Sequence, residues 1–328
     1  MNEIHARVIS QEKGLYKIQY GTEIKSAAVS GRFRYEAITV SDYPAVGDYV
    51  AADWSDENSN AVITELLPRK SCFIRKSAGP VKQEQVVAAN IDTVFICMSL
   101  NNNFNLRRLE RYLSITYDSG AIPVVILTKS DLCSDVESKI AEEENTAPGA
   151  DIIAVSSLEG DYDAVMKYIL PRKTVAFIGS SGVGKSTLIN KLIGEDEIAT
   201  GAIGNGDRGR HTTTHRELVT LENGAFVIDT PGMRELGMWD SGSGIDTAFH
   251  DIEELAQKCR FSDCTHTSEP DCAVRKALEE GELDADRLES YRKLKKENKY
   301  AADNSKYLEA KRTKFKEISK LNKSKRKR

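Results

Sequence analysis

The stretch TVAFIGSSGVGKSTLINKLIG at residues 174–194 decides the fold class of this chain. It reads as a short buried strand, a glycine-rich loop and an amphipathic helix, and the loop fits the pattern G-x-x-x-x-G-K-[ST]. Glycines let the backbone wrap around phosphate groups, and N–H groups at the start of the helix point at phosphate oxygens. The sequence therefore predicts an α/β domain whose phosphate-binding loop consists of Gly179, Ser180, Ser181, Gly182, Val183, Gly184, Lys185, Ser186 and Thr187.

Two side chains of this loop and a later motif predict the chemistry of a nucleoside triphosphate. Lys185 is expected to reach the β- and γ-phosphates, and Ser186 is expected to ligate Mg²⁺. Roughly 40 residues further on, the strand AFVID ends in the motif DTPG at 229–232. Asp229 can hold the Mg²⁺ through water, and the N–H of Gly232 can contact the γ-phosphate. A nucleotide switch is therefore predicted at this motif.

The segment between the two motifs predicts further catalytic residues. It contains RHTTTH, and either Thr213 or Thr214 is expected to supply a second oxygen to Mg²⁺; the sequence leaves open which one does. Met233 stands where many GTPases have a glutamine that orients water, so we expect slow intrinsic hydrolysis or another catalytic residue. His211 and His215 are the candidates, and we favour His211.

A second strand end predicts which base is bound. The apolar run IPVVIL leads into TKSD at 128–131. The carboxylate of Asp131 can accept hydrogen bonds from N1–H and the 2-amino group of guanine, a donor pair that adenine lacks. The stem of Lys129 can cover the base, and the backbone after the strand DIIAV can meet the guanine O6. The predicted base site consists of Thr128, Lys129, Ser130, Asp131, Ser156 and Ser157.

The order of these motifs is unusual. Most G domains place the phosphate loop first and the base-reading motif last, whereas here Asp131 precedes Gly179 by 48 residues. The same three-dimensional site can form if the chain is cut elsewhere and the old ends are joined. The sequence therefore predicts a circularly permuted P-loop GTPase.

Sequence periodicity predicts a multidomain protein. Residues 1–75 contain short β-type runs between turn residues, including YEAITV at 35–40, and predict a small all-β, antiparallel barrel of about five strands. Residues 76–85 read as a linker, and 86–240 as the α/β GTPase domain. The predicted buried strands of that domain lie at 93–98, 122–127, 151–155, 174–178 and 225–229. Residues 241–328 are expected to form an α-helical zinc-binding domain with a basic helical tail.

A cysteine and histidine cluster predicts the metal site of that last domain. Its spacing is C-x4-C-x-H-x5-C, which supplies three thiolates and one imidazole within 14 residues. Such a set fills all four positions of a tetrahedral structural Zn²⁺ and leaves none for catalysis. The predicted ligands are Cys259, Cys264, His266 and Cys272.

Composition limits the compartment and the partners. Six cysteines are too few for a disulfide scaffold, and no apolar run approaches the roughly 18 residues that span a bilayer, so we expect a cytoplasmic protein without membrane contact. Residues 287–328 carry 17 Lys or Arg against 5 Asp or Glu, a net charge of +12, which leaves −16 for the other residues. A basic tail on an acidic body favours a polyanionic partner, most often a nucleic acid. A merely solvated helix is the alternative.

With these motifs in place, the chain resembles the small-subunit-dependent GTPases of the RsgA/YjeQ family. The resemblance covers essentially the whole chain and rests on TKSD, GSSGVGKST, HTTT, DTPG and the Cys/His cluster, with VSGRFRYEA and YPAVGDYV in the barrel. It implies that residues 1–75 form an OB-fold-like, RNA-binding barrel. It also implies a GTPase that acts late in maturation of the small ribosomal subunit, binds rRNA through its flanking domains and is stimulated by the particle. Mg²⁺ with GTP, one structural Zn²⁺ and a monomeric chain are expected.

The sequence departs from the family pattern in two places. Thr128 replaces the usual Asn of N-K-x-D, so an amide that steadies the phosphate loop is expected to be missing, and the basic tail is longer than in many members. Two other functions remain as interpretations of the sequence. One is a P-loop ATPase or kinase, for which no acceptor-site motif is present. The other is an RNA-binding protein with a vestigial nucleotide site, which the intact Lys185, Ser186 and Asp229 disfavour.

Overall fold

The computed structural model describes residues 3–12, 14–54, 60–76, 84–101, 104–156, 162–193, 217–229 and 242–300. It divides into two compact units, Met1–Gly237 and Met238–Arg328, which we call the N-terminal and the C-terminal unit. Among the described residues, no helix has both the length and the apolar character needed to cross a membrane.

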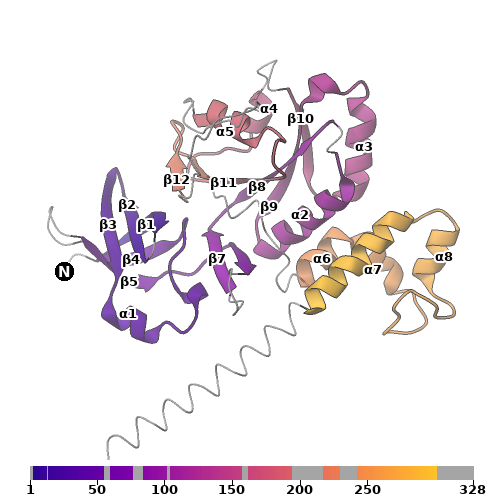
Figure 1. The fold of residues 1–328 in the computed structure, drawn as a ribbon, viewed down its shortest axis with the longest axis horizontal. Helices are drawn as coiled ribbons and strands as arrows, with labels where there is room; N and C mark the ends of the chain where they lie inside the picture. The colour runs from indigo at the N-terminus through magenta and orange to yellow at the C-terminus, as the bar shows by residue number, and fades with distance from the viewer. Residues whose placement is uncertain are drawn as a thin grey trace, which may run out of the picture. The chain divides into compact units, whose positions relative to one another are not determined.

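A closed five-stranded barrel forms the first part of the N-terminal unit (Figure 1). The barrel strands are β1 (Glu3–Glu12), β2 (Leu15–Tyr20), β3 (Glu23–Val29), β4 (Tyr49–Asp53) and β5 (Ala61–Leu66). They pair in the order β1-β2-β3-β5-β4, and β4 pairs back with β1, so the ring is closed. Alternate residues of β1 and β4, such as Ala6, Val8 and Val50, face a common apolar interior. The predicted barrel is confirmed.

The prediction of a strand at YEAITV, residues 35–40, is wrong. The hydroxyl of Ser30 accepts a hydrogen bond from the N–H of Phe33 at 3.0 Å and begins the short helix α1 (Gly31–Glu36). The carboxylate of Asp42 then accepts two backbone N–H bonds at 2.7 Å each and holds the chain in the 3-10 turn η1 (Val40–Asp42). Local capping therefore overrides the apolar alternation that suggested a strand.

A separate hairpin occupies the ends of the predicted linker. It consists of β6 (Cys72–Lys76) and β7 (Glu84–Ala89), which pair antiparallel. Residues 76, 84 and 85 therefore belong to strands, and the predicted boundary before residue 86 falls inside β7; residues 77–83 lie outside the described part. The three-domain division of the chain stays a prediction.

A mostly parallel sheet forms the rest of the N-terminal unit. Its strands follow the order β10 (Asp151–Val155), β9 (Ile122–Thr128), β8 (Thr93–Ser99), β11 (Thr174–Ile178), β13 (Phe226–Asp229) and β12 (Glu217–Thr220). All neighbours are parallel except β12, which is antiparallel to β13. The five predicted strands are confirmed, and the four-residue β12 is an addition. Because β12 also pairs with β1 through Ser10 and Glu217, the sheet continues into the barrel.

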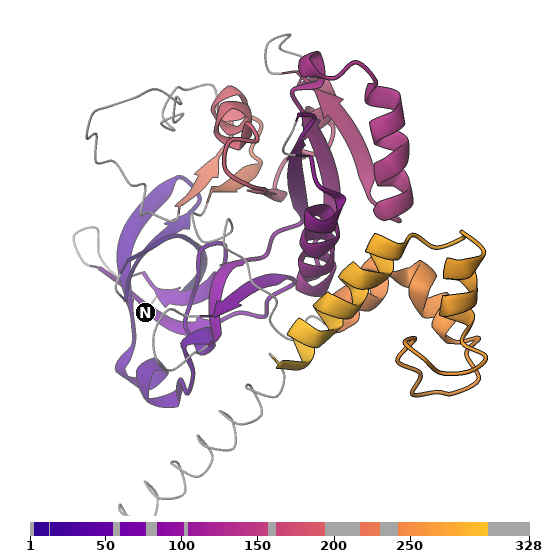
Figure 2. The ribbon, with the colours of Figure 1, turned by 45° about the vertical axis from the view of Figure 1, so that its right-hand side comes forward.

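Helices cover this sheet on both faces (Figure 2). They are α2 (Leu106–Ser119), α3 (Val136–Thr146), α4 (Asp163–Met166) and α5 (Lys185–Ile193), with the 3-10 turn η2 (Ser130–Leu132) after β9. Side chains of α4 and α5 share one apolar core with Phe95 and Phe177 of the sheet. On α2, Asn105 caps the first turn, and Gly120 ends the helix in the left-handed region at φ +84°.

Short helices form the C-terminal unit. They are α6 (Gly242–Ala248), α7 (His250–Ala256) and α8 (Ala273–Glu279), followed by a helix over 285–300. Phe249, Ile252, Val274 and Leu288 are buried between them. The predicted α-helical character of this part is confirmed, and residues 301–328 of the predicted tail lie outside the described part.

Candidate functional site

The phosphate loop joins β11 to α5, as the sequence predicts. Gly179 has φ +145°, and a Cβ at this position would lie 2.4 Å from the carbonyl oxygen of Cys97, so only glycine fits beneath the loop. Gly182 and Gly184 have φ of +77° and +95°, which also favour glycine. These conformations wrap the backbone around the N-terminus of α5, where N–H groups and the helix dipole attract an anion.

The ammonium group of Lys185 lies within this loop. Lys185 is 7% exposed, and its Nζ donates to the carbonyl oxygens of Gly179 at 2.5 Å and Ser180 at 2.6 Å. Ser186 and Thr187 follow in the first turn of α5 and are half-buried. The loop therefore places one cation and one hydroxyl beside the helix N-terminus, as phosphate and Mg²⁺ binding require.

The base motif contacts the phosphate loop directly. The hydroxyl of Thr128, at the end of β9, donates to the carbonyl oxygen of Val183 at 2.5 Å. Lys129 follows with φ +60°, and its Nζ donates to the carbonyl oxygen of Gly182 at 2.8 Å. Thr128 lacks the amide of the usual Asn, as expected, but its hydroxyl supplies a hydrogen bond to the phosphate loop.

Asp131 and Ser156 meet beyond the ends of two neighbouring strands. Asp131 lies in η2 after β9 and is exposed, and Ser156 follows β10 and is buried. The Ser156 hydroxyl donates to Oδ1 of Asp131 at 2.9 Å, which orients the carboxylate. Because β9 and β11 are separated only by β8 and all three run parallel, the carboxylate and the phosphate loop lie at the same edge of the sheet.

Several predicted site residues cannot be placed. Ser157, His211, Thr213, Thr214, His215, Gly232 and Met233 lie outside the described residues. The backbone of Asp229 ends β13 beside β11, but its side chain is not among those described. Their roles stay predictions.

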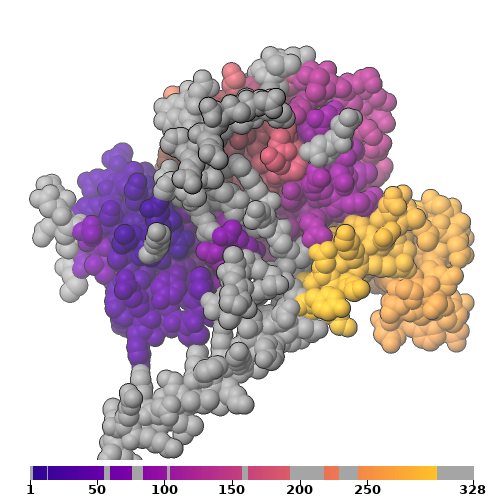
Figure 3. Space-filling view, in the orientation of Figure 1, coloured from indigo at the N-terminus to yellow at the C-terminus, as the bar shows by residue number. Residues whose placement is uncertain are grey.

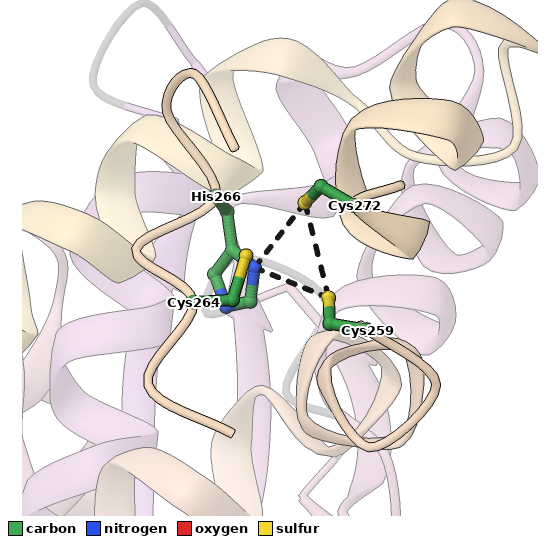
Figure 4. A group of neighbouring side chains, drawn as sticks. All are labelled: Cys259, Cys264, His266 and Cys272. Carbon is green, nitrogen blue, oxygen red and sulfur yellow. Dashed lines mark hydrogen bonds between the residues drawn. The ribbon is translucent and has the colours of Figure 1, made fainter. Parts of the chain in front are cut away.

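The four predicted metal ligands converge in the C-terminal unit (Figure 4). Their ligand atoms all lie within 4.8 Å of one another. The Sγ atoms of Cys259 and Cys272 are 3.8 Å apart, and they lie 3.6 and 3.5 Å from Nδ1 of His266. Tetrahedral zinc, with bonds of about 2.3 Å to sulfur and about 2.0–2.1 Å to nitrogen, requires separations of about 3.8 and 3.5 Å. The cluster therefore fits a zinc ion.

The surroundings of the cluster also fit a metal held by thiolates. Burial opposes ionisation of Cys259, yet backbone hydrogen bonds from Val274 and Ala273 lower the pKa of this thiol below its ordinary value. His266 has φ +59°, and its carbonyl oxygen accepts a hydrogen bond from Arg292. The helix over 285–300 therefore helps to hold the ligand loop.

The sequence profile of the RsgA GTPase family matches residues 66–239, which contain the base motif, the phosphate loop and the switch motif in their permuted order. The chain belongs to the RsgA GTPase family. It is therefore a GTPase.

Relatives of this RsgA-family chain match it over nearly its whole length. A protein of Lactiplantibacillus plantarum named small ribosomal subunit biogenesis GTPase RsgA 2 is 47% identical over 311 residues, which cover 94% of this chain and 87% of the relative. Small ribosomal subunit biogenesis GTPase RsgA 1 of Oceanobacillus iheyensis is 44% identical over 323 residues, which cover 97% and 92%.

Solved structures support the same assignment. YjeQ from Thermotoga maritima matches with a TM-score of 0.67 and 26% identity over 90% of this chain and 99% of that one. YloQ, described as a circularly permuted GTPase, matches with a TM-score of 0.64 and 26% identity over 91% and 96%. The predicted circular permutation of this RsgA GTPase is confirmed.

One contact of the RsgA phosphate loop was not predicted from the sequence. Nη1 of Arg108, in the first turn of α2, donates to the hydroxyl of Ser180 at 3.1 Å. The arginine is 72 residues away from this serine in sequence. An arginine in an amphipathic helix reads as a surface residue, so only the fold brings this pair together.

The first part of the basic tail is a structural helix. Leu288 and Leu294 are 2% exposed. Arg287 forms a bidentate ion pair with Asp251, and Lys295 pairs with Asp246. In Figure 3 the helix over 285–300, drawn in yellow, lies at the surface of the C-terminal unit, so one side of it is accessible. Part of the predicted basic charge is therefore neutralised within the unit.

Proposed function

We propose that this GTPase acts in the biogenesis of the small ribosomal subunit, binding the particle and hydrolysing GTP there late in maturation. The names of the relatives, which match over most of the chain, support this task. The observation that carries the nucleotide part is the contact of Thr128 and Lys129 with the phosphate loop, because it joins the base motif to the phosphate motif.

In the proposed reaction, the residues of this chain bind and orient GTP. The carboxylate of Asp131, oriented by Ser156, reads guanine, and the loop N–H groups and Lys185 hold the phosphates. Ser186 and Asp229 are the proposed Mg²⁺ residues, and the ion neutralises charge that develops on the phosphates.

We assign hydrolysis to the residues that precede β12 and to those that follow β13. Thr213 or Thr214 provides a further oxygen near the γ-phosphate, and the N–H of Gly232 responds to that phosphate. His211 orients the attacking water in place of the glutamine that Met233 replaces. We therefore expect slow turnover in the absence of a partner.

We further propose that Cys259, Cys264, His266 and Cys272 hold one structural Zn²⁺ per chain. The separations among Cys259, Cys272 and His266 match those of tetrahedral zinc, and Cys264 supplies a fourth ligand atom within 4.8 Å of the others. The ion contributes folding free energy to the C-terminal unit and takes no part in hydrolysis.

The proposed partner surface combines the barrel with the end of the basic tail. Residues 301–328 carry 11 Lys or Arg and 3 Asp or Glu, a net charge of +8, and a polyanion such as rRNA complements that charge. Because residues 287–300 are part of the folded unit, the informative truncation removes 301–328. We expect a monomeric, cytoplasmic protein.

Turnover of GTP and ATP, measured with and without purified small subunits, tests this function. We expect GTP turnover to be slow alone and stimulated by the subunits, with no turnover of ATP. Lys185→Ala should abolish turnover but leave subunit binding largely intact. Truncation of 301–328 should reduce the salt dependence of binding and leave turnover without subunits unchanged.

Three outcomes would contradict the proposal. Turnover of ATP would favour the ATPase or kinase reading, and no GTP turnover under any condition would favour a vestigial site. GTP turnover that small subunits do not change would defeat the proposed partner.

A further inference from the structure

Arg7 of the barrel strand β1 is a buried cation that the nucleotide chemistry leaves unexplained. It is 6% exposed, and its Nη2 donates to Oγ1 of Thr174 at 2.5 Å and to the carbonyl oxygen of Asn90 at 3.5 Å. Its Nε and Nη1 have no hydrogen-bond partner among the described residues. Buried donors without partners cost folding free energy. The two unpartnered donors are therefore a cost to stability that the other contacts of Arg7 have to offset.

Two aromatic rings surround this guanidinium group. Its central carbon lies 4.5 Å from the ring centroid of Phe226 and 4.9 Å from that of Tyr49. These contacts offset part of the lost hydration through cation–π attraction. Tyr49 belongs to the barrel strand β4 and Phe226 to the sheet strand β13, so Arg7 joins the barrel to the sheet.

The residues that Arg7 contacts stand at the starts of the strands that lead to the nucleotide. Thr174 is the first residue of β11, which ends at the phosphate loop. Phe226 is the first residue of β13, which ends at Asp229. On the same barrel strand, Ser10 pairs with Glu217, the first residue of β12, two residues after His215.

The barrel also approaches the sheet closely at a second point. Gly47 has φ +90°, and a Cβ there would lie 2.1 Å from the carbonyl oxygen of Ala89 and 3.1 Å from Cδ1 of Ile228. The side-chain amide of Asn90 donates to the carbonyl oxygen of Gly47 at 3.1 Å. Such close backbone contact leaves little room for sliding, because packed interiors transmit displacement.

We propose that Arg7 is a positioning residue that couples a partner bound to the barrel to the strands of the nucleotide site. The inference rests on the proposed function, because the partner that we expect to bind the barrel is the small ribosomal subunit. A displacement of β1 would move the starts of β11 and β13 with it through Thr174 and Phe226. Coupling between two binding sites is reciprocal. If the bound partner changes the affinity for GTP by some factor, bound GTP changes the affinity for the partner by the same factor.

Arg7→Met tests this coupling, because it keeps an unbranched stem and removes the cation with its unpaired donors. We expect an unchanged or raised melting temperature, and unchanged GTP affinity and turnover without subunits. In the wild-type protein, the subunit Kd should differ by about tenfold between the GDP form and a form with a non-hydrolysable GTP analogue. In Arg7→Met this ratio should fall to about one, and stimulation of kcat should be lost. Lys139→Met is the control, since Lys139 is a cation of α3, outside the barrel, that pairs with Glu142.

A merely structural role would lower the melting temperature and leave the ratio of the two Kd values unchanged. If Arg7→Met shows the same ratio of Kd values and the same stimulation as the wild-type protein, the coupling is overturned. The proposed function would then remain intact. A wild-type protein without stimulation and without a nucleotide-dependent Kd would overturn both. If Arg7→Met does not fold, Thr174→Val removes the acceptor at the start of β11 and should lower the ratio in the same direction.

A readout without ribosomes completes the test. Hydrogen exchange of the amides of β1 should change between the GDP form and the GTP-analogue form of the wild-type protein. In Arg7→Met this change should disappear, although the exchange of the phosphate loop still responds to the nucleotide. A change in β1 that persists in the variant would overturn the role of Arg7.

Discussion

The nucleotide site and the metal cluster are built in opposite ways. The nucleotide motifs follow buried strands whose side chains, such as Phe95 and Phe177, share a large apolar core. The metal ligands lie around α7 and α8, which have seven residues each, in a unit with few buried apolar side chains among its described residues. We therefore expect this unit to depend on its proposed metal for folding. The comparison therefore predicts that the nucleotide site survives without its ligand and that the metal site does not.

The largest expected effect comes from removing a metal ligand. Structural zinc contributes about 10–16 kcal/mol of apparent binding free energy, so Cys264→Ser should lose bound metal and unfold the C-terminal unit. The unfolding transition of the N-terminal unit should stay unchanged in calorimetry. Cys133→Ser, a change at a half-buried cysteine of the N-terminal unit, is the control. Elemental analysis that finds no stoichiometric zinc in the wild-type protein would refute the prediction.

The next effect concerns the pH dependence of the N-terminal unit. Burial, with a smaller contribution from Glu142, raises the pKa of Glu143 to about 8, and neither of its carboxylate oxygens has a hydrogen-bond partner among the described residues. The unfolded chain ionises Glu143 near pH 4.5, so the unit loses stability as pH rises from about 4.5 to about 8. Glu143→Gln, which mimics the protonated acid, should add about 3 kcal/mol of stability at pH 7.

Denaturant unfolding at several pH values measures this difference. The gain of Glu143→Gln over the wild-type protein should shrink toward zero as the pH falls to about 4.5. Glu144→Gln, an exposed neighbour in α3, is the control and should show no such pH dependence. A gain that is the same at every pH would contradict the assignment.

Replacing the base reader should change binding without changing the fold. Asp131→Asn removes the carboxylate that we propose accepts two guanine hydrogen bonds, so GTP affinity should fall about 100-fold. Binding of xanthosine triphosphate should improve, because the amide can donate to the 2-carbonyl group that a carboxylate repels. The melting temperature without nucleotide should stay the same, since Asp131 is exposed. Titration calorimetry that shows unchanged GTP affinity would sink the assignment.

The strands and the metal ligands could be predicted from the sequence for physical reasons. Continuous apolar runs such as TVFICM and IPVVIL have no polar face, and only a sheet covered on both sides buries them. The spacing of Cys259, Cys264, His266 and Cys272 brings four ligands together within one short loop and two helix ends, so no distant contact was needed.

Other features depended on contacts that spacing does not show. The helix α1 and the turn η1 follow from capping by Ser30 and Asp42, which outweighed the apolar pattern of YEAITV. The strand β12 has four residues and is held by pairing with β13 and β1. The role of Thr128 depends on a carbonyl 55 residues further along the chain. Local sequence cannot reveal such partners.

The smallest expected effect tests that threonine. Thr128→Val keeps the shape of the side chain and removes the hydroxyl that donates to the carbonyl oxygen of Val183. The loss of one hydrogen bond of about 1 kcal/mol should weaken GTP binding about fivefold. Thr128→Asn, which restores a donor, is the matched comparison and should bind GTP close to the wild-type level. Equal affinities of all three proteins would show that this link does not support the loop.

Nucleotide binding to the metal-free protein tests the central contrast most directly. The protein is stripped of metal with a chelator, the unfolding of the C-terminal unit is verified by circular dichroism, and GTP and ATP are then titrated calorimetrically in the presence of Mg²⁺. We expect one GTP to bind per chain with the affinity of the metal-loaded protein, and no ATP to bind. Loss of GTP binding together with the metal would contradict it, because the nucleotide site would then depend on the C-terminal unit.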